Sequence, residues 1–440
     1  MYAALLARRM EEIRRNLWRI AVMRSGLLIL TLMTLTVLGL ALGWSAHRQG
    51  RFSKLKQKLK QEPATPQSPA AARPGGQDAI VLQRTRLEGQ DVPEFLTATV
   101  LPGRGMNVLQ ITAYLPNKGE VSLLASPTLD EAGRSLNGTG LDAIGEGSLS
   151  VGAAFEAPWA NRIFGTPSRD RHNATVEWHG HSLGLPASKT SRSEAVVAMG
   201  GLLLNHGTTS ASTNVMPDGG AAQAIFEAGD FGGHWVSRTE ITTSVQLSSR
   251  AVEIRIAARN TGDEPEPMGL GWHPRFAILS GDRGHATLHM PNALRSEVRD
   301  RQTGLPTGKL LPVTDTPYDF TTWSGRQLGE LSLDDSFVHL RPALLDNGPI
   351  AELRDPKSNY GLRITAITPT IKAMRVYAPA SENFVSIEPQ FNYDDPFGTE
   401  WPRQEDTGMV VLQPGQSVQW QIRLEIFSLD PGRRFDPAQP

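Results

Sequence analysis

The chain has 440 residues, and its 44 Lys and Arg residues against 45 Asp and Glu residues leave a net charge of -1. This balance excludes nucleic-acid binding driven by the charge of the whole chain. The chain contains no Cys, which excludes disulfides, thiolate catalysis and Cys-ligated metal sites. At about 150 residues per domain, the length allows between one large and about three small domains.

The first predicted element is a transmembrane helix over residues 25–46. No charged residue occurs in this segment, and about 20 apolar residues in a helix cross a bilayer core. Residues 1–24 combine an apolar stripe with several Arg residues, which predicts a basic amphipathic juxtamembrane segment. A cleaved signal peptide is the alternative, but both of its regions would be unusually long.

Basic residues flank the predicted span equally on both sides, so the positive-inside rule does not decide its orientation. Because the span lies so near the N-terminus, we expect a signal anchor. We therefore expect a single-pass membrane protein with its soluble domain on the extracytoplasmic (periplasmic) side.

A flexible linker is predicted over residues 47–78, where charged residues give way to Pro, Ala and Gly. Strand patterns then dominate residues 79–435. Apolar and polar residues alternate from Val418 to Ile426, and two alternating runs, 239–247 and 252–258, flank a short turn and predict a hairpin. Long amphipathic helices and repeats are absent from the pattern, so the sequence predicts one antiparallel all-β domain with two or more packed sheets.

Two short motifs could carry acid–base chemistry. His273 lies between Trp272 and Pro274 in GWHPRF, and a histidine can donate and accept protons near neutral pH. Glu388 closes an apolar strand in SIEPQ, where partial burial could raise its pKa. The structural alternatives are a histidine bonded to a loop carbonyl and an edge-strand carboxylate that faces solvent.

Two further motifs could bind hydroxyl groups. Arg162 follows Asn161 in PWANRI and could direct its guanidinium at a ligand, whereas Asp334 in LDDSF could accept hydrogen bonds from two hydroxyls. A buried Arg that bonds loop carbonyls and a solvated turn are the structural alternatives.

Other readings of the sequence are weaker. Residues 180–184 match the G-x-S-x-G pattern of a serine-hydrolase nucleophile elbow, but no helix pattern follows, so we expect a turn or strand there. The histidines lack the spacing of a metal site. We therefore expect no metal.

Together and in this order, the four motifs resemble the aldose 1-epimerase (galactose mutarotase) family. The resemblance implies a β-supersandwich with a sugar site and no cofactor, in which Glu388 is the base and His273 the acid that open and reclose a pyranose ring. It also implies that Arg162, Asp334, Asn161 and Trp272 bind the substrate, a monosaccharide or the reducing end of an oligosaccharide.

The sequence departs from the family at two places. Gly200 stands where the family usually has a second active-site histidine, and His206, six residues on, is expected to face elsewhere. Arg275 stands where a Tyr is often found; we expect a surface position, with a place at the site rim, suited to an acidic or phosphorylated sugar, as the alternative. The two functions that remain are a membrane-anchored mutarotase and a non-catalytic carbohydrate-binding domain tethered to the membrane.

Overall fold

The computed structural model describes residues 14, 36, 72–87, 91–188 and 196–430 of the chain. Two compact units divide at residue 70, and the second comprises residues 71–440. Apart from residues 14 and 36, the predicted segments 1–24 and 25–46 lie outside the described residues, as does most of the predicted linker. Among the residues that are described, no helix has the length and apolar character needed to cross a membrane.

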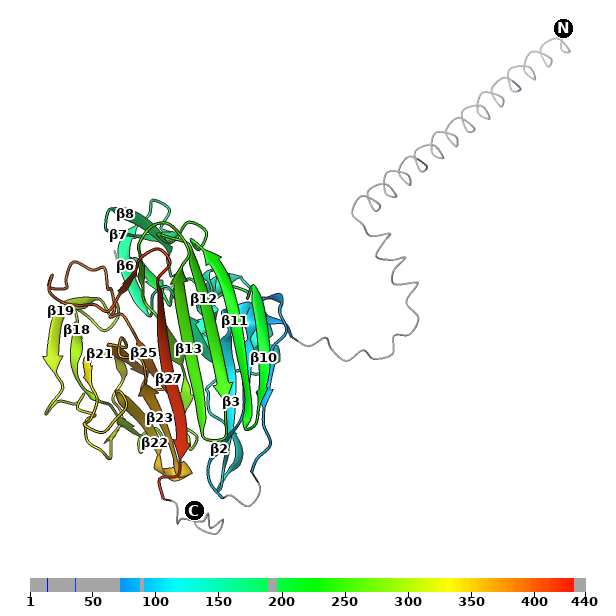
Figure 1. The fold of residues 1–440 in the computed structure, drawn as a ribbon, viewed down its shortest axis with the longest axis vertical. Coiled ribbons are helices and arrows are strands. Elements are labelled where there is room, and N and C mark those ends of the chain that lie inside the picture. Colours follow the sequence, from blue (N-terminus) through cyan, green and yellow to red (C-terminus); the bar gives the residue numbers. More distant parts are fainter. Residues whose placement is uncertain (1–13, 15–35, 37–71, 88–90, 189–195, 431–440) are drawn as a thin grey trace, which may run out of the picture. The chain divides into compact units, whose positions relative to one another are not determined.

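The second unit is built mostly from antiparallel strands, as its alternating sequence predicts (Figure 1). The larger sheet has 12 strands. In spatial order they are β1 (Ile80–Gln83), β2 (Glu94–Leu101), β3 (Asn107–Leu115), β5 (Ala153–Glu156), β15 (Gly271–Pro274), β25 (Phe384–Gln390), β24 (Ala373–Ala378), β21 (Leu333–Arg341), β18 (Asn292–Val298) and β19 (Pro306–Pro312), with β4 (Gly119–Ser122) beside β3 and β16 (Phe276–Ala277) beside β25.

The second large sheet has 9 strands. In spatial order they are β10 (Ser210–Met216), β11 (Gly219–Gly229), β12 (Thr239–Leu247), β13 (Ala251–Asn260), β27 (Ser417–Phe427), β23 (Tyr360–Ala366), β22 (Ile350–Asp355), β17 (Thr287–His289) and β20 (Arg326–Gln327). The predicted hairpin is confirmed, because β12 and β13 pair in antiparallel register from Leu247↔Val252 to Thr239↔Asn260.

Two small sheets and a few short helices complete the unit. The strands are β8 (His181–Pro186), β7 (Asn173–Trp178), β6 (Arg162–Pro167) and β9 (Val196–Met199) in one sheet and β14 (Glu266–Met268) and β26 (Val410–Leu412) in the other. The helices are α3 (Leu129–Ser135) and the 3-10 turns η1 (Pro74–Gly76), η2 (Pro102–Arg104), η3 (Gly140–Ile144), η4 (Glu146–Ser150) and η5 (Pro356–Ser358). α3 begins at a capping box, in which Thr128 and Glu131 satisfy each other's backbone N–H groups.

The two large sheets share one hydrophobic core. Alternate residues of β13 and β27, such as Ile254, Ile256 and Trp420, are fully buried, and they belong to the same cluster as Val385 and Ile387 of β25. Most of the intervening positions of β13 and β27 hold polar residues, so one face of the second sheet is exposed in part. β25 differs because all seven of its residues are buried. Both faces of the larger sheet are therefore covered at its centre.

The alternation along β25 explains how the fold forms a polar site. Val385 and Ile387 face the shared core, so Ser386, Glu388 and Gln390 must face the opposite side of the sheet. β15 and β24 flank β25 directly, and β21 lies next to β24. Polar residues of these four strands thus gather on the outer face of the larger sheet.

Candidate active site

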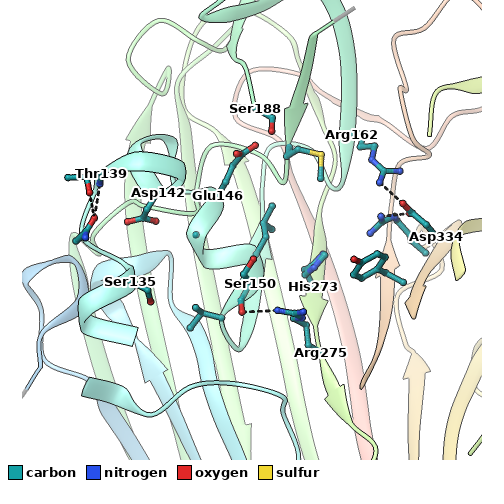
Figure 2. Close-up of a pocket in the computed structure, with 17 residues that line it drawn as sticks. Ser135, Thr139, Asp142, Glu146, Ser150, Arg162, Ser188, His273, Arg275 and Asp334 are labelled. Atoms are coloured by element: carbon teal, nitrogen blue, oxygen red, sulfur yellow. Dashed lines mark hydrogen bonds and ion pairs between the residues drawn. The ribbon is translucent and has the colours of Figure 1, made fainter. Parts of the chain in front are cut away.

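A cavity of about 700 Å³ lies over this outer face. Figure 2 shows that Arg162, His273 and Asp334 line one side of it, whereas residues of η3 and η4 such as Asp142 and Glu146 line the other. The volume is that of a site for a small ligand. The fold therefore places three of the predicted site residues, which lie on the separate strands β6, β15 and β21, at one cavity.

His273 and Glu388 form a pair at the base of the cavity. Nδ1 of His273 lies 3.2 Å from Oε2 of Glu388. The His273 side chain is 10% exposed and lines the cavity, whereas the Glu388 side chain behind it is 0% exposed. Since Nδ1 faces Glu388, Nε2 is the ring nitrogen left for a ligand.

Arg375 holds Glu388 from a second side. Its Nη1 donates to Oε1 and Oε2 of Glu388 at 3.2 and 3.3 Å. Burial alone would raise the pKa of Glu388, but the neighbouring His273 and the Arg375 guanidinium outweigh it and lower this pKa. Glu388 is therefore held as a carboxylate, the form that a base requires.

Asp334 joins two guanidinium groups at the cavity wall. Its Oδ2 accepts from Nη2 of Arg162 at 2.7 Å, and its Oδ1 accepts from Nη2 of Arg375. Although burial opposes it, the charges of Arg375 and Arg162 hold the pKa of Asp334 well below its usual range. The next residue, Asp335, faces the other side of β21 and pairs with Arg295 at 2.9 Å. The adjacent carboxylates thus serve different regions.

A second glutamate, Glu156, lies close to the pair. It ends β5, and its carboxyl group is fully buried. Burial first, and then the negative charge of Glu388, raise the pKa of Glu156 to about 7, although His273 acts in the opposite direction. The two carboxyl groups of the site therefore differ in pKa, which is the condition for one to be protonated while the other is ionised.

The same three residues are spaced as metal ligands could be. Among the described residues, one ligand atom each from Glu156, His273 and Glu388 lie within 4.8 Å of one another. A cation at this position would meet the Arg375 guanidinium, which already donates to both Glu388 oxygens. The charge arrangement thus favours proton transfer over metal binding.

Two predicted substrate-binding residues need correction. Side chains alternate along β15, so Gly271 and His273 face the site, whereas Trp272 faces the core. Trp272 is 0% exposed and packs edge to face against Phe276 at 6.1 Å between ring centroids. Asn161 is also buried, at 1% exposure; its backbone N–H donates to Oε1 of Glu156 at 3.2 Å. Asn161 thus supports the site from beneath.

Gly200 and Arg275, the two departures from the family pattern, have defined places in the fold. Gly200 has φ 68°, in the left-handed region, and its N–H donates to the Asn161 carbonyl at 2.7 Å. His206 faces away, as expected, and packs edge to face against Phe231.

Arg275 lines the cavity, donates to the Ser150 carbonyl at 2.9 Å and lies over the Phe384 ring. The expectation that Arg275 is a surface residue is therefore wrong.

The sequence reasoning missed Glu156 and Arg375. Each is a charged residue inside an apolar strand, in AAFEA and AMRVYA. A charged residue in an apolar strand is also the pattern that singled out Glu388, and the same pattern indicates Glu156 and Arg375. The G-x-S-x-G stretch forms a turn at Gly180 and the strand β8, in agreement with the expectation.

Comparisons with known proteins match this fold. Three similar solved structures are a galactose mutarotase-like protein from Clostridium acetobutylicum (TM-score 0.62, 16% identity, covering 80% of this chain and 99% of that chain), an aldose epimerase homologue from C. elegans (0.58, 21%, 80% and 99%) and a galactose 1-epimerase from Lactobacillus acidophilus NCFM (0.54, 14%, 79% and 98%). The chain therefore has the galactose mutarotase-like fold.

The sequence comparison supports the same assignment. Residues 212–425 match the family model for aldose 1-epimerase, a range that contains His273, Asp334 and Glu388 but not Arg162. The resemblance to the aldose 1-epimerase family is thereby confirmed. No curated protein matches the sequence.

Proposed function

We propose that the domain is an aldose 1-epimerase that interconverts the α and β anomers of an aldose. The observation that carries the proposal is the His273–Glu388 pair, 3.2 Å apart, with His273 on the wall of the cavity. The substrate is a monosaccharide or the reducing end of an oligosaccharide. Arg162 and Asp334 would hold its hydroxyl groups from the same wall.

The reaction needs a base and an acid close together. The Glu388 carboxylate takes the proton of the C1 hydroxyl, and the electron pair of that O–H bond forms the C1 carbonyl. The C1–O5 bond breaks toward O5, which takes a proton from His273. Rotation about the C1–C2 bond followed by the reverse steps gives the other anomer. Acid–base assistance of this kind contributes roughly 10² to 10⁴ in rate.

Access to Glu388 sets a condition on this mechanism. The carboxylate is fully buried behind His273 and Arg375, and both of its oxygens accept hydrogen bonds. The sugar must therefore separate Nδ1 of His273 from Oε2 of Glu388 when it binds. Each group then acts on a different substrate oxygen.

The test is anomerisation of α-glucose and α-galactose, followed by polarimetry or NMR with the full chain in detergent. Glu388→Gln and His273→Asn are expected to abolish the acceleration. Glu405→Gln is the matched control, because Glu405 forms a similar pair with His339, at 2.8 Å, outside this cavity. An acceleration that survives in Glu388→Gln would contradict the proposed base.

A second candidate is a non-catalytic carbohydrate-binding domain. The burial of Glu388 and the glycine at position 200 favour it. Binding of galactose in calorimetry without any acceleration by the wild-type chain would select this function over the first.

We further propose that residues 25–46 anchor the protein in the membrane as a single-pass helix, with the domain on the extracytoplasmic (periplasmic) side. The uncharged stretch supports this. Because the chain has no Cys, a single Cys at Val215, which is 91% exposed, allows labelling with a membrane-impermeant maleimide. Labelling in intact spheroplasts is expected; labelling only after lysis would contradict this topology.

A further inference from the structure

The carboxyl group of Glu156 occupies a space that two glycines leave open. A Cβ atom on Gly200 would lie 3.1 Å from Oε1 of Glu156, and a Cβ atom on Gly271 would lie 3.2 Å from Oε2. Either contact is tighter than ordinary van der Waals packing. Glu156 therefore fills the region toward which a side chain at position 200 would begin.

The sheet register directs Glu156 toward the His273–Glu388 pair. β5 and β15 pair Glu156 with Gly271, and β15 and β25 pair Gly271 with Gln390. Residues two apart on a strand share a face. His273 is two residues from Gly271, and Glu388 is two residues from Gln390. Both therefore lie on the same face of the sheet as Glu156.

Only one of the two carboxyl oxygens of Glu156 accepts a hydrogen bond from the described residues. Oε1 accepts from the Asn161 N–H at 3.2 Å. Oε2 is buried and has no hydrogen-bond partner among the described residues. One atom of this carboxyl group lies within 4.8 Å of both a ring nitrogen of His273 and an oxygen of Glu388. A carboxyl group at this distance interacts electrostatically with the pair and, through a small movement, can exchange a proton with it.

We propose that Glu156 is a positioning residue that sets the proton state of the His273–Glu388 pair, in place of the histidine that the family resemblance leads one to expect at Gly200. This inference rests on the proposed function for its catalytic meaning. The charged groups that face Glu156 are His273 from β15, Glu388 from β25 and Arg375 from β24.

The two states of Glu156 have different effects on the pair. When Glu156 is neutral, Glu388 is the anion beside His273. When Glu156 is ionised, a second negative charge stabilises the proton on the His273 ring, which is the acid form. Because the pKa of Glu156 is raised to about 7, both states are populated at neutral pH.

The first test does not depend on activity. We would record the ring-nitrogen shifts of His273 in the full chain, labelled at histidine, across the neutral pH range, with His273→Asn to assign the signals. The wild type is expected to show a step near pH 7 that Glu156→Gln removes. Glu156→Asp, which shortens the carboxyl side chain, should retain a smaller step and serves if the Gln variant does not fold. An identical titration in wild type and Glu156→Gln would overturn the proposal.

Glu266→Gln is the matched control. Glu266 is also fully buried, and its pKa is also raised to about 7 by burial, against a hydrogen bond from Thr239, but it lies on β14 outside the cavity wall. This variant is expected to retain the step in the His273 signals. Loss of the step in Glu266→Gln as well would mean that it reports a general change of the fold, which would also overturn the proposal.

The second test connects the residue to the reaction. Glu156→Gln is expected to lower kcat about tenfold at about pH 8 and less than about twofold at about pH 6, with KM nearly unchanged. A residue with only a structural role would lower kcat equally at both pH values, and that result would count against the proposal. If the wild type itself does not accelerate anomerisation, the proposed function fails, and the NMR titration alone decides on Glu156.

Discussion

The Arg375 guanidinium donates to both carboxylate oxygens of Glu388, at 3.2 and 3.3 Å, and a second nitrogen of the same group donates to Asp334. One buried cation thus connects the predicted base to the predicted sugar-binding carboxylate. A substitution at position 375 is therefore expected to affect both chemistry and stability.

Arg375→Met should raise the pKa of Glu388, because His273 and Arg375 both lower it against burial and the substitution removes the second of these charges. The carboxylate form would then be lost at a higher pH, so the acid limb of the pH–rate profile should move upward. Unfolding should be easier by about 3 kcal/mol, since the buried Glu388 and the partly buried Asp334 each lose one of their charged partners. Denaturant unfolding and the pH dependence of kcat/KM measure the two effects; an unmoved acid limb would show that Arg375 does not set the charge of Glu388.

Adding a side chain at position 200 should destabilise the domain. Gly200 has φ 68°, and a Cβ atom there would lie 2.9 Å from Leu149 Cδ2 and 3.1 Å from Glu156 Oε1. Gly200→Ala should cost about 1 to 2 kcal/mol for the left-handed backbone alone. In a double-mutant cycle with Glu156→Ala, the second substitution should recover part of the loss. Purely additive free energies of unfolding would contradict the contact between the two positions.

Glu156→Gln should change how stability depends on pH. The pKa of Glu156 is raised from 4.5 to about 7 in the folded state. The unfolded chain therefore releases this proton first, and wild-type stability falls as pH rises between these values. The Gln variant does not lose stability in this way. Its free energy of unfolding should therefore rise relative to that of the wild type by about 3 kcal/mol between the two pKa values and keep this difference at higher pH. Urea titrations at several pH values test this; a difference that does not depend on pH would refute it.

Trp272→Phe separates a core role from a sugar-binding role. The indole is fully buried against Phe276 in the shared core. The substitution should lower the free energy of unfolding by about 1 to 3 kcal/mol, because the smaller ring leaves a void. Sugar affinity, measured by calorimetry on the folded variant, should be unchanged. A large loss of affinity at unchanged stability would restore Trp272 as a ligand contact.

The strands of the domain were predictable where one face of a sheet is buried and the other is partly exposed. β12, β13 and β27 follow the alternation of their sequences because solvent and core select opposite residue types at successive positions. β25 also alternates between apolar and polar residues, but all seven of its residues are buried, because its polar face meets the site and not solvent. Its strand character came from its apolar residues and from the proline near its end.

Single residues of the site were predictable from their motifs, but their arrangement around the cavity was not. His273, Arg162 and Asp334 reach the cavity as expected. The error at Trp272 arose because a motif places neighbours together in sequence, whereas a strand sends them to opposite faces. The role of Glu156 could not be read at all, since its carboxyl group meets Gly200 and Gly271, residues that are near it only in the folded sheet.

The arrangement of β25 bears on how such a domain can change over evolutionary time. Val385 and Ile387 belong to the core, whereas Ser386, Glu388 and Gln390 point to the cavity side. Exchanges at the second set can alter the ligand or the reaction while the packing that keeps the domain folded is preserved. Core positions and cavity-side positions can therefore be selected for different properties within one strand of seven residues, and Glu388 links the two through its pair with the buried Arg375.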